Sequence, residues 1–459
     1  MSNSPLQFVI LAAGQGKRMR SALPKMLHPL AGIPLVEHVI GAARASAPTA
    51  IALVIGHGAE QVRATLAHQP LTFVLQDPPR GTGDAVRAAL DRLPHDGVTV
   101  VANGDCPLIG AATFNALAAE AAHGRLALLT ARVADPRGLG RVTRSEDGRV
   151  RAIVEDRDAS AAERAIDEIY TGALAAPSAL LAAWVAKLEP HNAQGEFYLT
   201  DIVAMALADG VAVRALPAAD ADDALGVNDR AQLAGVERIV QRRRAAALMG
   251  GGTTIADPAR IDVRGTLTAA PDTSIDVGCV FEGNVSLAAG VHVGPYCVLR
   301  NTQVDAGTRI EAFSHLDGAT IGAGARIGPY ARLRPGAVLA GDVHIGNFVE
   351  VKAATIGARS KANHLAYIGD ASVGTDVNFG AGSITANYDG ANKHHTQIGD
   401  NVHVGSNCVL VAPIDIGPGA TIGGGSTVTK SAPANELTLA RTKQVSLPGW
   451  KRARKAKPA

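Results

Sequence analysis

Residues 398–428 read Ile398-Gly-Asp-Asn-Val-His-Val404-Gly-Ser-Asn-Cys-Val-Leu410-Val-Ala-Pro-Ile-Asp-Ile416-Gly-Pro-Gly-Ala-Thr-Ile422-Gly-Gly-Gly-Ser-Thr-Val428, with an aliphatic side chain at every sixth position. A period of six matches neither the helical repeat nor the two-residue repeat of a strand. It is typical of a solenoid whose coils have three short flat faces, with one hexapeptide per face and the aliphatic side chain pointing to the axis.

The same ladder occurs twice more upstream of this stretch. The sequence therefore predicts a parallel β-helix from about Ile255 to Val428. Residues 385–397 carry no six-residue signal, so we expect them to leave the coil as a loop, where repeat proteins often place functional residues. The upstream ladder positions are Ile275, Phe281, Leu287, Val293 and Leu299, then Ile321, Ile327, Leu333, Leu339, Ile345 and Val351.

Composition narrows the class of protein. A chain of 459 residues is too long for one core, so two domains are expected. A formal net charge of +2 and an aromatic content of 3% argue against nucleic acid as a partner. The four cysteines follow no metal-binding spacing, and the N-terminus shows neither a signal peptide nor a membrane span. We expect a soluble, cytoplasmic protein with no membrane partner.

Residues 1–227 alternate between short apolar segments and alanine-rich segments. This alternation predicts an open, Rossmann-like α/β sheet with helices on both faces, which binds ligands beyond the carboxyl ends of its strands. The predicted strands are Phe8–Ala12, Ile51–Ile55, Leu71–Leu75, Val98–Ala102 and Leu126–Ala131, and the predicted helices include Pro34–Ala45 and Gly83–Leu93.

A helical segment follows this half of the chain. Asp229–Met249 contains one glycine and no proline, and its apolar residues recur at helical spacing, which predicts a helix of about 30 Å. Gly250-Gly251-Gly252 ends the helix. The predicted domains are therefore residues 1–228, a long linker helix over residues 229–250, and the β-helix over residues 251–459 with a basic tail.

The first predicted strand runs into the glycine-rich turn Ala13-Gly14-Gln15-Gly16-Lys17-Arg18-Met19, followed by Pro24-Lys25. Glycines let backbone N–H groups approach a phosphate, and Arg18 and Lys25 offer positive charge to a polyphosphate. The spacing matches neither a Walker A loop nor the dinucleotide fingerprint. A glycine-rich turn alone leaves a plain strand–helix connection open.

The longer pattern Leu11-Ala-Ala-Gly-x-Gly-x-Arg-Met19 with Pro24-Lys25 resembles the signature of sugar-phosphate nucleotidyltransferases. Gln76 with Gly81-Thr82-Gly83-Asp84-Ala85 resembles the uracil-reading segment of that family, and Asn103-Gly104-Asp105 resembles its metal-bearing turn. The resemblance implies that Asp105 and Asn228 bind Mg²⁺, a hard cation that takes few protein ligands.

Lys25 and Arg18 are the expected catalytic residues of this half, because the reaction brings two polyanions together and needs fixed positive charge. One departure from the family is Tyr170, which precedes Thr171-Gly172 where asparagine is frequent. The resemblance implies that UTP and the UDP-sugar contact Leu11, Ala12, Ala13, Gly14, Lys25, Gln76, Gly81, Thr82, Asn103, Gly104, Asp105, Gly140, Glu155 and Asn228.

The C-terminal repeats resemble a family of hexapeptide acyltransferases that wind left-handed, assemble as trimers and place active sites between neighbouring coils. Among the polar residues of residues 347–387, His364 is the expected general base, since a neutral imidazole can accept a proton from an attacking amine. Glu350 is expected to orient the site. The resemblance implies contacts to glucosamine-1-phosphate from Arg334, Lys352, Tyr367, Asn378 and Lys393, and to acetyl-CoA from Ala381, Asn387, Tyr388, Ser406, Gly424 and Arg441.

Taken in this order, the two halves resemble a family of bacterial bifunctional enzymes from Leu11 to about Arg441. The resemblance implies acetyl transfer from acetyl-CoA to glucosamine-1-phosphate in the C-terminal half. Uridylyl transfer from UTP to N-acetylglucosamine-1-phosphate would follow in the N-terminal half, giving UDP-N-acetylglucosamine for the cell wall and pyrophosphate. It also implies a homotrimer.

Two alternatives remain open at this point. One is a single-activity sugar-1-phosphate nucleotidyltransferase whose β-helix is structural, and the motif around His364 and Asn387-Tyr388 argues against it. The other is a scaffold protein whose sites have decayed, and the intact Lys25, Asp105 and His364 argue against that.

Overall fold

The computed structural model describes residues 5–453, and the end of the predicted basic tail, from residue 454, lies outside them. The chain divides into two compact units, residues 1–242 and residues 243–459, called the first and second unit here. Among the described residues no helix is long and apolar enough to cross a membrane.

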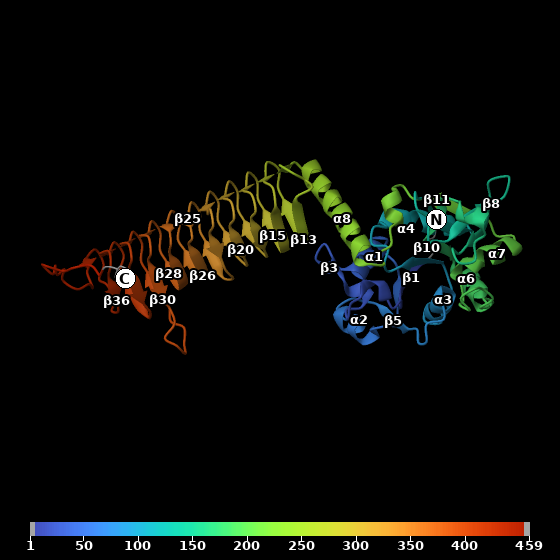
Figure 1. Cartoon of the computed structure of the whole chain (residues 1–459), viewed down its shortest axis with the longest axis horizontal. Helices are drawn as coiled ribbons and strands as arrows, with labels where there is room; N and C mark the ends of the chain where they lie inside the picture. The colour runs from blue at the N-terminus through green and yellow to red at the C-terminus, as the bar shows by residue number, and fades with distance from the viewer. Residues whose placement is uncertain (1–4, 454–459) are drawn as a thin grey trace, which may run out of the picture. The chain divides into compact units, whose positions relative to one another are not determined.

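The first unit is built on a sheet covered by helices (Figure 1). Its strands are β1 (Leu6–Ala12), β2 (Pro29–Leu30), β3 (Ile33–Pro34), β4 (Ala50–Ile55), β5 (Thr72–Leu75), β6 (Val98–Asn103), β7 (Leu126–Arg132), β8 (Arg141–Arg144), β9 (Val150–Val154), β10 (Glu168–Pro177) and β11 (Val213–Pro217). Its helices are α1 (Leu35–Ala45), α2 (Ala59–Thr65), α3 (Thr82–Leu90), α4 (Ala111–Ala122), α5 (Ala161–Arg164), α6 (Ser178–Ala186) and α7 (Ile202–Ala208), with 3-10 turns η1 (Lys17–Met19), η2 (Lys25–Leu27), η3 (Leu199–Asp201) and η4 (Ala221–Ala224).

The main path of the sheet runs β11-β7-β10-β6-β1-β4-β5. Alternate residues of β1 belong to different cores: Phe8 and Ile10 pack with α1 and α4 on one face, and Val9 packs with α3 and α6 on the other. Because both faces are covered, β1 reads as a continuous apolar run. The predicted sheet with helices on both faces is confirmed.

Strand β10 is antiparallel to both of its neighbours, β6 and β7, whereas β1, β4, β5 and β6 pair in parallel. The sequence analysis did not predict β10 or the β8–β9 hairpin. The core stretch of β10 reads Ala173-Leu-Ala-Ala, which favours a helix by intrinsic propensity. Burial between two strands overrides that preference, since all four residues are at most 1% exposed.

Helix α8 (Arg230–Gly250) lies within the predicted linker helix over residues 229–250 and ends at its last residue. Val236 and Ile239 in its first half pack with Leu35 of the first unit. Ala245 near its end belongs to the core of the second unit. The three glycines then end the helix, with φ of +94° at Gly252.

The second unit is a parallel β-helix whose coils stack along one axis (Figure 1). One sheet contains β12 (Thr254–Ile255), β14 (Ser274–Ile275), β16 (His292–Val293), β19 (Arg309–Ile310), β22 (Arg326–Ile327), β25 (His344–Asn347), β27 (Lys361–His364), β29 (Asn378–Phe379), β32 (His403–Val404), β35 (Thr421–Ile422) and β37 (Leu437–Thr438). The other contains β13 (Ile261–Ala269), β15 (Cys279–Leu287), β17 (Val298–Arg300), β18 (Gln303–Val304), β20 (His315–Asp317), β21 (Thr320–Ile321), β23 (Arg332–Leu333), β24 (Ala337–Leu339), β26 (Glu350–Ile356), β28 (Tyr367–Val373), β30 (Ile384–Ala386), β31 (Thr396–Ile398), β33 (Val409–Val411), β34 (Ile414–Ile416) and β36 (Thr427–Val428).

The strand register shows one coil per 17 or 18 residues along most of the axis, as in Ile310↔Ile327 and Ile327↔Ile345. Phe379 pairs instead with Val404, because the segment between β30 and β31 leaves the coil (Figure 1). The predicted loop is confirmed over residues 387–395, whereas Thr385 and Ala386 belong to β30 and Thr396 and Gln397 belong to β31. Every predicted ladder residue is at most 3% exposed, so the period of six does mark the side chains that fill the axis.

Candidate active sites

The glycine-rich turn follows β1 and leads into η1 and η2. Gly16 has φ of +59°, and a Cβ atom there would lie 2.6 Å from Cβ of Lys25. Only glycine fits this position without displacing the lysine. The turn thereby holds the start of η2, and with it Lys25, against the end of β1.

Lys25 lies between the two predicted metal ligands. Its Nζ is 2.5 Å from Oδ2 of Asp105 and 3.0 Å from Oδ1 of Asn228. The backbone N–H of Val227 donates to the carbonyl of Asp105 at 2.9 Å, which holds the segment before α8 beside the turn after β6. Three segments far apart in sequence thus bring one cation and two oxygen ligands together.

This donor set fits magnesium. A carboxylate and an amide oxygen are hard ligands, and Mg²⁺ is usually held by one or two carboxylates together with waters and substrate phosphates. Among the described residues no group of three or more histidine, cysteine, aspartate or glutamate side chains is placed to hold a metal. Asp105 and Asn228 thus present two oxygen atoms of the kind that magnesium takes as ligands.

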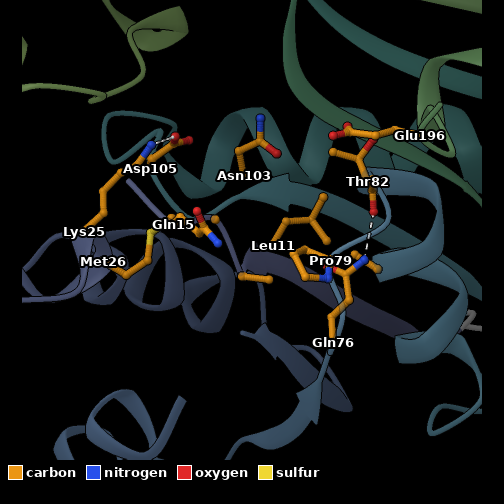
Figure 2. A pocket seen from close by; sticks show the side chains of 14 residues that line it. Leu11, Gln15, Lys25, Met26, Gln76, Pro79, Thr82, Asn103, Asp105 and Glu196 are labelled. Carbon is orange, nitrogen blue, oxygen red and sulfur yellow. Dashed lines mark hydrogen bonds and ion pairs between the residues drawn. The ribbon is translucent and has the colours of Figure 1, made fainter. Parts of the chain in front are cut away.

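A cavity of about 460 Å³ extends from Lys25 and Asp105 at one end to Gln76 and Thr82 at the other (Figure 2). Its cationic end suits a polyphosphate and its other end presents the Gln76 amide. The predicted residues that line this cavity are Leu11, Ala13, Gly14, Lys25, Gln76, Gly81, Thr82, Asn103 and Asp105.

A second cavity of about 280 Å³ shares Leu11, Thr82, Asn103 and Asp105 with the first. Its lining includes the predicted Arg18, Gly140, Glu155 and Asn228, and also Tyr170. The two cavities therefore meet at Asp105, where two substrates bound in them would come together.

Two partly buried groups that line the second cavity, Glu155 and Tyr170, have raised pKa values. Burial raises the pKa of Glu155, aided by the negative charge of Asp201, although Thr200 Oγ1 donates to its carboxylate at 3.1 Å. Burial also raises the pKa of Tyr170 well above its usual range, so its hydroxyl stays protonated. A hydroxyl and a carboxylate can both bind sugar hydroxyls.

The structure also shows why glycine follows Thr171. Gly172 has φ of +89°, and a Cβ atom there would lie 2.1 Å from Nδ2 of Asn103. The glycine makes room for the Asn103 side chain. Two predicted residues line neither cavity: Ala12 is 2% exposed in the core, and Gly104 donates its N–H to the carbonyl of Leu11 at 2.9 Å.

Several lining residues belong to no motif in the sequence. Met26, which follows Lys25 in η2, and Glu196 line the first cavity, and Leu139, Thr200 and Gly226 line the second. The folded chain brings the loop before β8, the segment that leads into η3 and the segment before α8 to these cavities.

In the second unit, His364 ends β27 and pairs in register with Asn347, which ends β25 one coil earlier. Nδ1 of His364 lies 2.9 Å from Oδ1 of Asn347. An amide oxygen accepts hydrogen bonds only, so Nδ1 must carry the proton and Nε2 keeps its lone pair in the neutral ring. The pair thus sets the tautomer needed for a base. The sequence analysis did not assign Asn347 this role, although it lies one coil, 17 residues, before His364.

Cationic side chains gather on the neighbouring coils. Arg334 donates to Glu350 at 2.8 Å. Nζ of Lys352 lies 3.9 Å from Asp370. The pKa of Lys393 is lowered chiefly by the hydrogen bond and positive charge of Lys352, so the loop brings these two lysines of one chain together. An anion such as a phosphate would relieve their repulsion.

The loop between β30 and β31 is held by its own contacts. Tyr388 and Lys393 form an antiparallel bridge. The Asn387 amide donates to Asp370, and lies 3.4 Å from the Tyr367 hydroxyl. Asn387 thereby ties the loop to the coil that carries Tyr367.

Four of the predicted acetyl-CoA residues, Ala381, Ser406, Gly424 and Arg441, lie on coils that are connected in sequence by hydrogen bonds, whereas Asn387 and Tyr388 lie in the loop. The N–H of Asn407 donates to the carbonyl of Ala381, and that of Gly425 donates to the carbonyl of Ser406, both at 2.8 Å. Arg441 donates to the carbonyl of Gly424 at 2.8 Å. Asn378, in β29, stands three residues before Ala381.

Three family models match segments of the chain. Residues 8–195 match the MobA-like NTP transferase domain, residues 263–367 match the GMPPB C-terminal domain, and residues 395–430 match the bacterial transferase hexapeptide in six repeats. The predicted order of a nucleotidyltransferase domain followed by a left-handed β-helix of hexapeptide repeats is confirmed.

Curated relatives span the whole chain. The "Bifunctional protein GlmU" of Methylibium petroleiphilum is 55% identical, covering 98% of this chain and 99% of its own. Those of Aromatoleum aromaticum and Herminiimonas arsenicoxydans are each 54% identical over 98% of this chain, and cover 99% and 100% of their own lengths. The chain belongs to the GlmU family of bifunctional enzymes, with a uridyltransferase and an acetyltransferase in one polypeptide.

Proposed function

We propose that residues 1–228 carry uridylyl transfer, residues 229–250 link the two activities, and residues 251–459 carry acetyl transfer. The second half makes N-acetylglucosamine-1-phosphate from glucosamine-1-phosphate and acetyl-CoA, and the first half couples it to UTP. The single observation that supports this most is the meeting of two cavities at Asp105, since two polyanionic substrates must react beside a bound cation.

In the first unit, the larger cavity would hold UTP, with the uracil toward Gln76 and the phosphates toward Lys25. The smaller cavity would hold N-acetylglucosamine-1-phosphate beside Glu155 and Gly140. A phosphate oxygen of the sugar attacks the α-phosphorus of UTP in line, an O–P bond forms, and the bond to the pyrophosphate group breaks. Lys25 and Arg18 supply fixed positive charge along this path.

Asp105 and Asn228 would hold magnesium, which supplies charge stabilisation to the phosphates when bound. Nζ of Lys25 contacts both of these oxygens. With magnesium held there, the ammonium group of Lys25 would lie beside the ion and could contact the phosphates. The remaining nucleotide contacts would come from Leu11, Ala13, Gly14, Gly81, Thr82 and Asn103, which line the larger cavity, whereas the predicted Ala12 and Gly104 do not.

In the second unit, Nε2 of His364 would accept the proton of the substrate amine while the amine attacks the thioester carbonyl. The C–N bond forms, the C–S bond breaks, and the CoA thiolate takes up a proton. Arg334, Lys352 and Lys393 would hold the acceptor phosphate, with Tyr367 and Asn378 on the sugar. Acetyl-CoA would lie along Ala381, Asn387, Tyr388, Ser406, Gly424 and Arg441.

We also propose a homotrimer assembled through the β-helix, in keeping with the hexapeptide match, and a cytoplasmic enzyme. All four cysteines are free and buried, which fits a reducing compartment. Light scattering that shows a monomer with full acetyltransferase activity would contradict the trimer.

A coupled assay tests the proposal. The purified protein is given glucosamine-1-phosphate, acetyl-CoA, UTP and magnesium, and CoA thiol and pyrophosphate are followed separately. Release of both is the expected result. If no CoA thiol is released, and pyrophosphate is released only when N-acetylglucosamine-1-phosphate is supplied, the β-helix has a structural role and no acetyltransferase activity.

A further inference from the structure

The Gln76 side chain at one end of the larger cavity uses its amide nitrogen within the protein. Nε2 of Gln76 lies 3.0 Å from the carbonyl oxygen of Gly81 and 3.0 Å from Oδ2 of Asp84 (the contact to Gly81 is drawn in Figure 2). A primary amide nitrogen has two N–H donors. Both donors are therefore engaged, and no hydrogen bond of Oε1 occurs among the described residues.

Asp84 is held as a carboxylate. Nη2 of Arg87 donates to its Oδ1 at 2.7 Å, and Nη2 of Arg80 lies 3.6 Å away. Burial raises the pKa of Asp84, but the hydrogen bonds from Gln76 and Arg87 and the charges of both arginines outweigh burial and lower it. The guanidinium of Arg87 is itself placed over the Phe197 ring, 4.9 Å from its centre.

An ionised carboxylate can only accept hydrogen bonds. If the Gln76 amide were turned over, Oε1 would face two acceptors, the carbonyl of Gly81 and the carboxylate of Asp84. Gln76 and Asp84 are each 6% exposed, so water cannot screen that repulsion well. The carbonyl of Gly81 and the ionised carboxylate of Asp84 thus hold the amide in this orientation together.

We propose that Asp84 is a positioning residue that fixes the Gln76 amide with its carbonyl oxygen free for the nucleotide base, and so sets the preference for uracil over cytosine. On its pairing edge uracil has an N3–H donor, whereas cytosine has an N3 acceptor. An acceptor in the site therefore matches uracil and opposes the cytosine ring nitrogen. The inference rests on the proposed function of the first unit and adds the residue that enforces its choice of nucleotide.

The test is the Asp84→Asn variant. Arg87 would keep the carbonyl oxygen of the substituted side chain as its acceptor, which turns the new NH₂ group toward Gln76. The new NH₂ group and the Gln76 NH₂ group would then face each other, which favours inversion of the Gln76 amide, with only the Gly81 carbonyl opposing it, and an inverted amide presents a donor to the base. A matched control is Asp91→Asn, which removes the same charge from an exposed position on the same side of the first unit.

The measurement is kcat and KM of pyrophosphate release with UTP and with CTP. We expect the ratio of kcat/KM for UTP over CTP to fall by about tenfold to a hundredfold in Asp84→Asn, the range for a buried polar group left mispaired. The loss should lie mainly in KM for UTP, because the base is remote from the reacting phosphorus. Asp91→Asn should keep the wild-type ratio.

An unchanged UTP/CTP ratio in a folded Asp84→Asn protein would overturn the inference, as would an equal fall in kcat for both nucleotides. If Asp84→Asn does not fold, Arg87→Gln replaces it: this variant leaves the carboxylate but loosens it, and a smaller fall in the ratio is expected. An unchanged ratio there overturns the inference too. Wild-type protein that releases no pyrophosphate from UTP would refute the proposed function instead.

Discussion

Lys25 forms an ion pair with Asp105. When this lysine is replaced, we expect the stability of the first unit to depend on magnesium. Nζ of Lys25 lies 2.5 Å from the carboxylate, and the two side chains are 8% and 18% exposed. Lys25→Met keeps an apolar stem of similar length. It leaves the Asp105 carboxylate beside Asn228 with no cation in contact.

The structure sets the expected size of the effect. Removing one partner of a buried ion pair costs about 3–5 kcal/mol, and the partial exposure of Asp105 places the cost lower, at about 2–3 kcal/mol. One kcal/mol shifts the melting temperature of a domain of 150–250 residues by about 2–4 °C. Lys25→Met should therefore melt about 4–12 °C lower than wild type in EDTA.

Adding magnesium should restore much of the lost melting temperature of Lys25→Met. A ligand at a hundred times its Kd stabilises the folded state by about 2.7 kcal/mol. In the wild type, Lys25 competes for the same two oxygens, so the melting temperature should respond less to magnesium. The ion would thus substitute for the lysine.

Tryptophan fluorescence is a suitable assay. The chain has two tryptophans: Trp184 is fully buried in the first unit, whereas Trp450 is 71% exposed. The emission shift on heating therefore reports mainly on the first unit. Lys17→Met is the matched control, since it removes the same charge from an exposed residue of the same turn. Equal melting of Lys25→Met and wild type in EDTA, or an equal response of both to magnesium, would refute this reasoning.

Three further predictions follow from other sites. His364→Ala should slow CoA thiol release by about 10²–10⁴-fold, and Asn347→Ala should slow it by about tenfold. Pyrophosphate release should be unchanged in both variants. Thiol release at the wild-type rate in His364→Ala would disprove the assignment of His364 as the base. Burial raises the pKa of Glu155, so above the ordinary glutamate value of 4.5 the folded wild type must ionise a buried carboxyl, which lowers its unfolding free energy. The unfolding free energy of Glu155→Gln relative to wild type should therefore be larger at about pH 8 than at about pH 4 in denaturant titrations. An equal difference between variant and wild type at both pH values would contradict this prediction. Leu410→Ala should lower the unfolding free energy of the β-helix by about 2–5 kcal/mol in denaturant titration, without affecting pyrophosphate release. A loss below about 0.5 kcal/mol, the lower end of the range for Ile→Val, would show that Leu410 does not lie in a packed core.

The sequence predicted the second unit more completely than the first. Each coil of a β-helix contacts only its neighbours, so its fold follows from a local repeat that can be read directly. The aliphatic ladder and the existence of the loop between β30 and β31 both follow from that rule. In the first unit, β10 was missed because its alanine-rich run is made extended by the strands on either side.

The sequence by itself determined the repeat, the linker helix and the residue types gathered in each motif, because these depend on neighbours along the chain. Only the tertiary structure decided which atoms meet. Lys25 reaches Asp105 and Asn228 across 80 and 203 positions. Asn347 reaches His364 through coil stacking. The orientation of Gln76 likewise depends on the ionised Asp84, because charge, burial and hydrogen-bond direction exist only once distant segments are packed together.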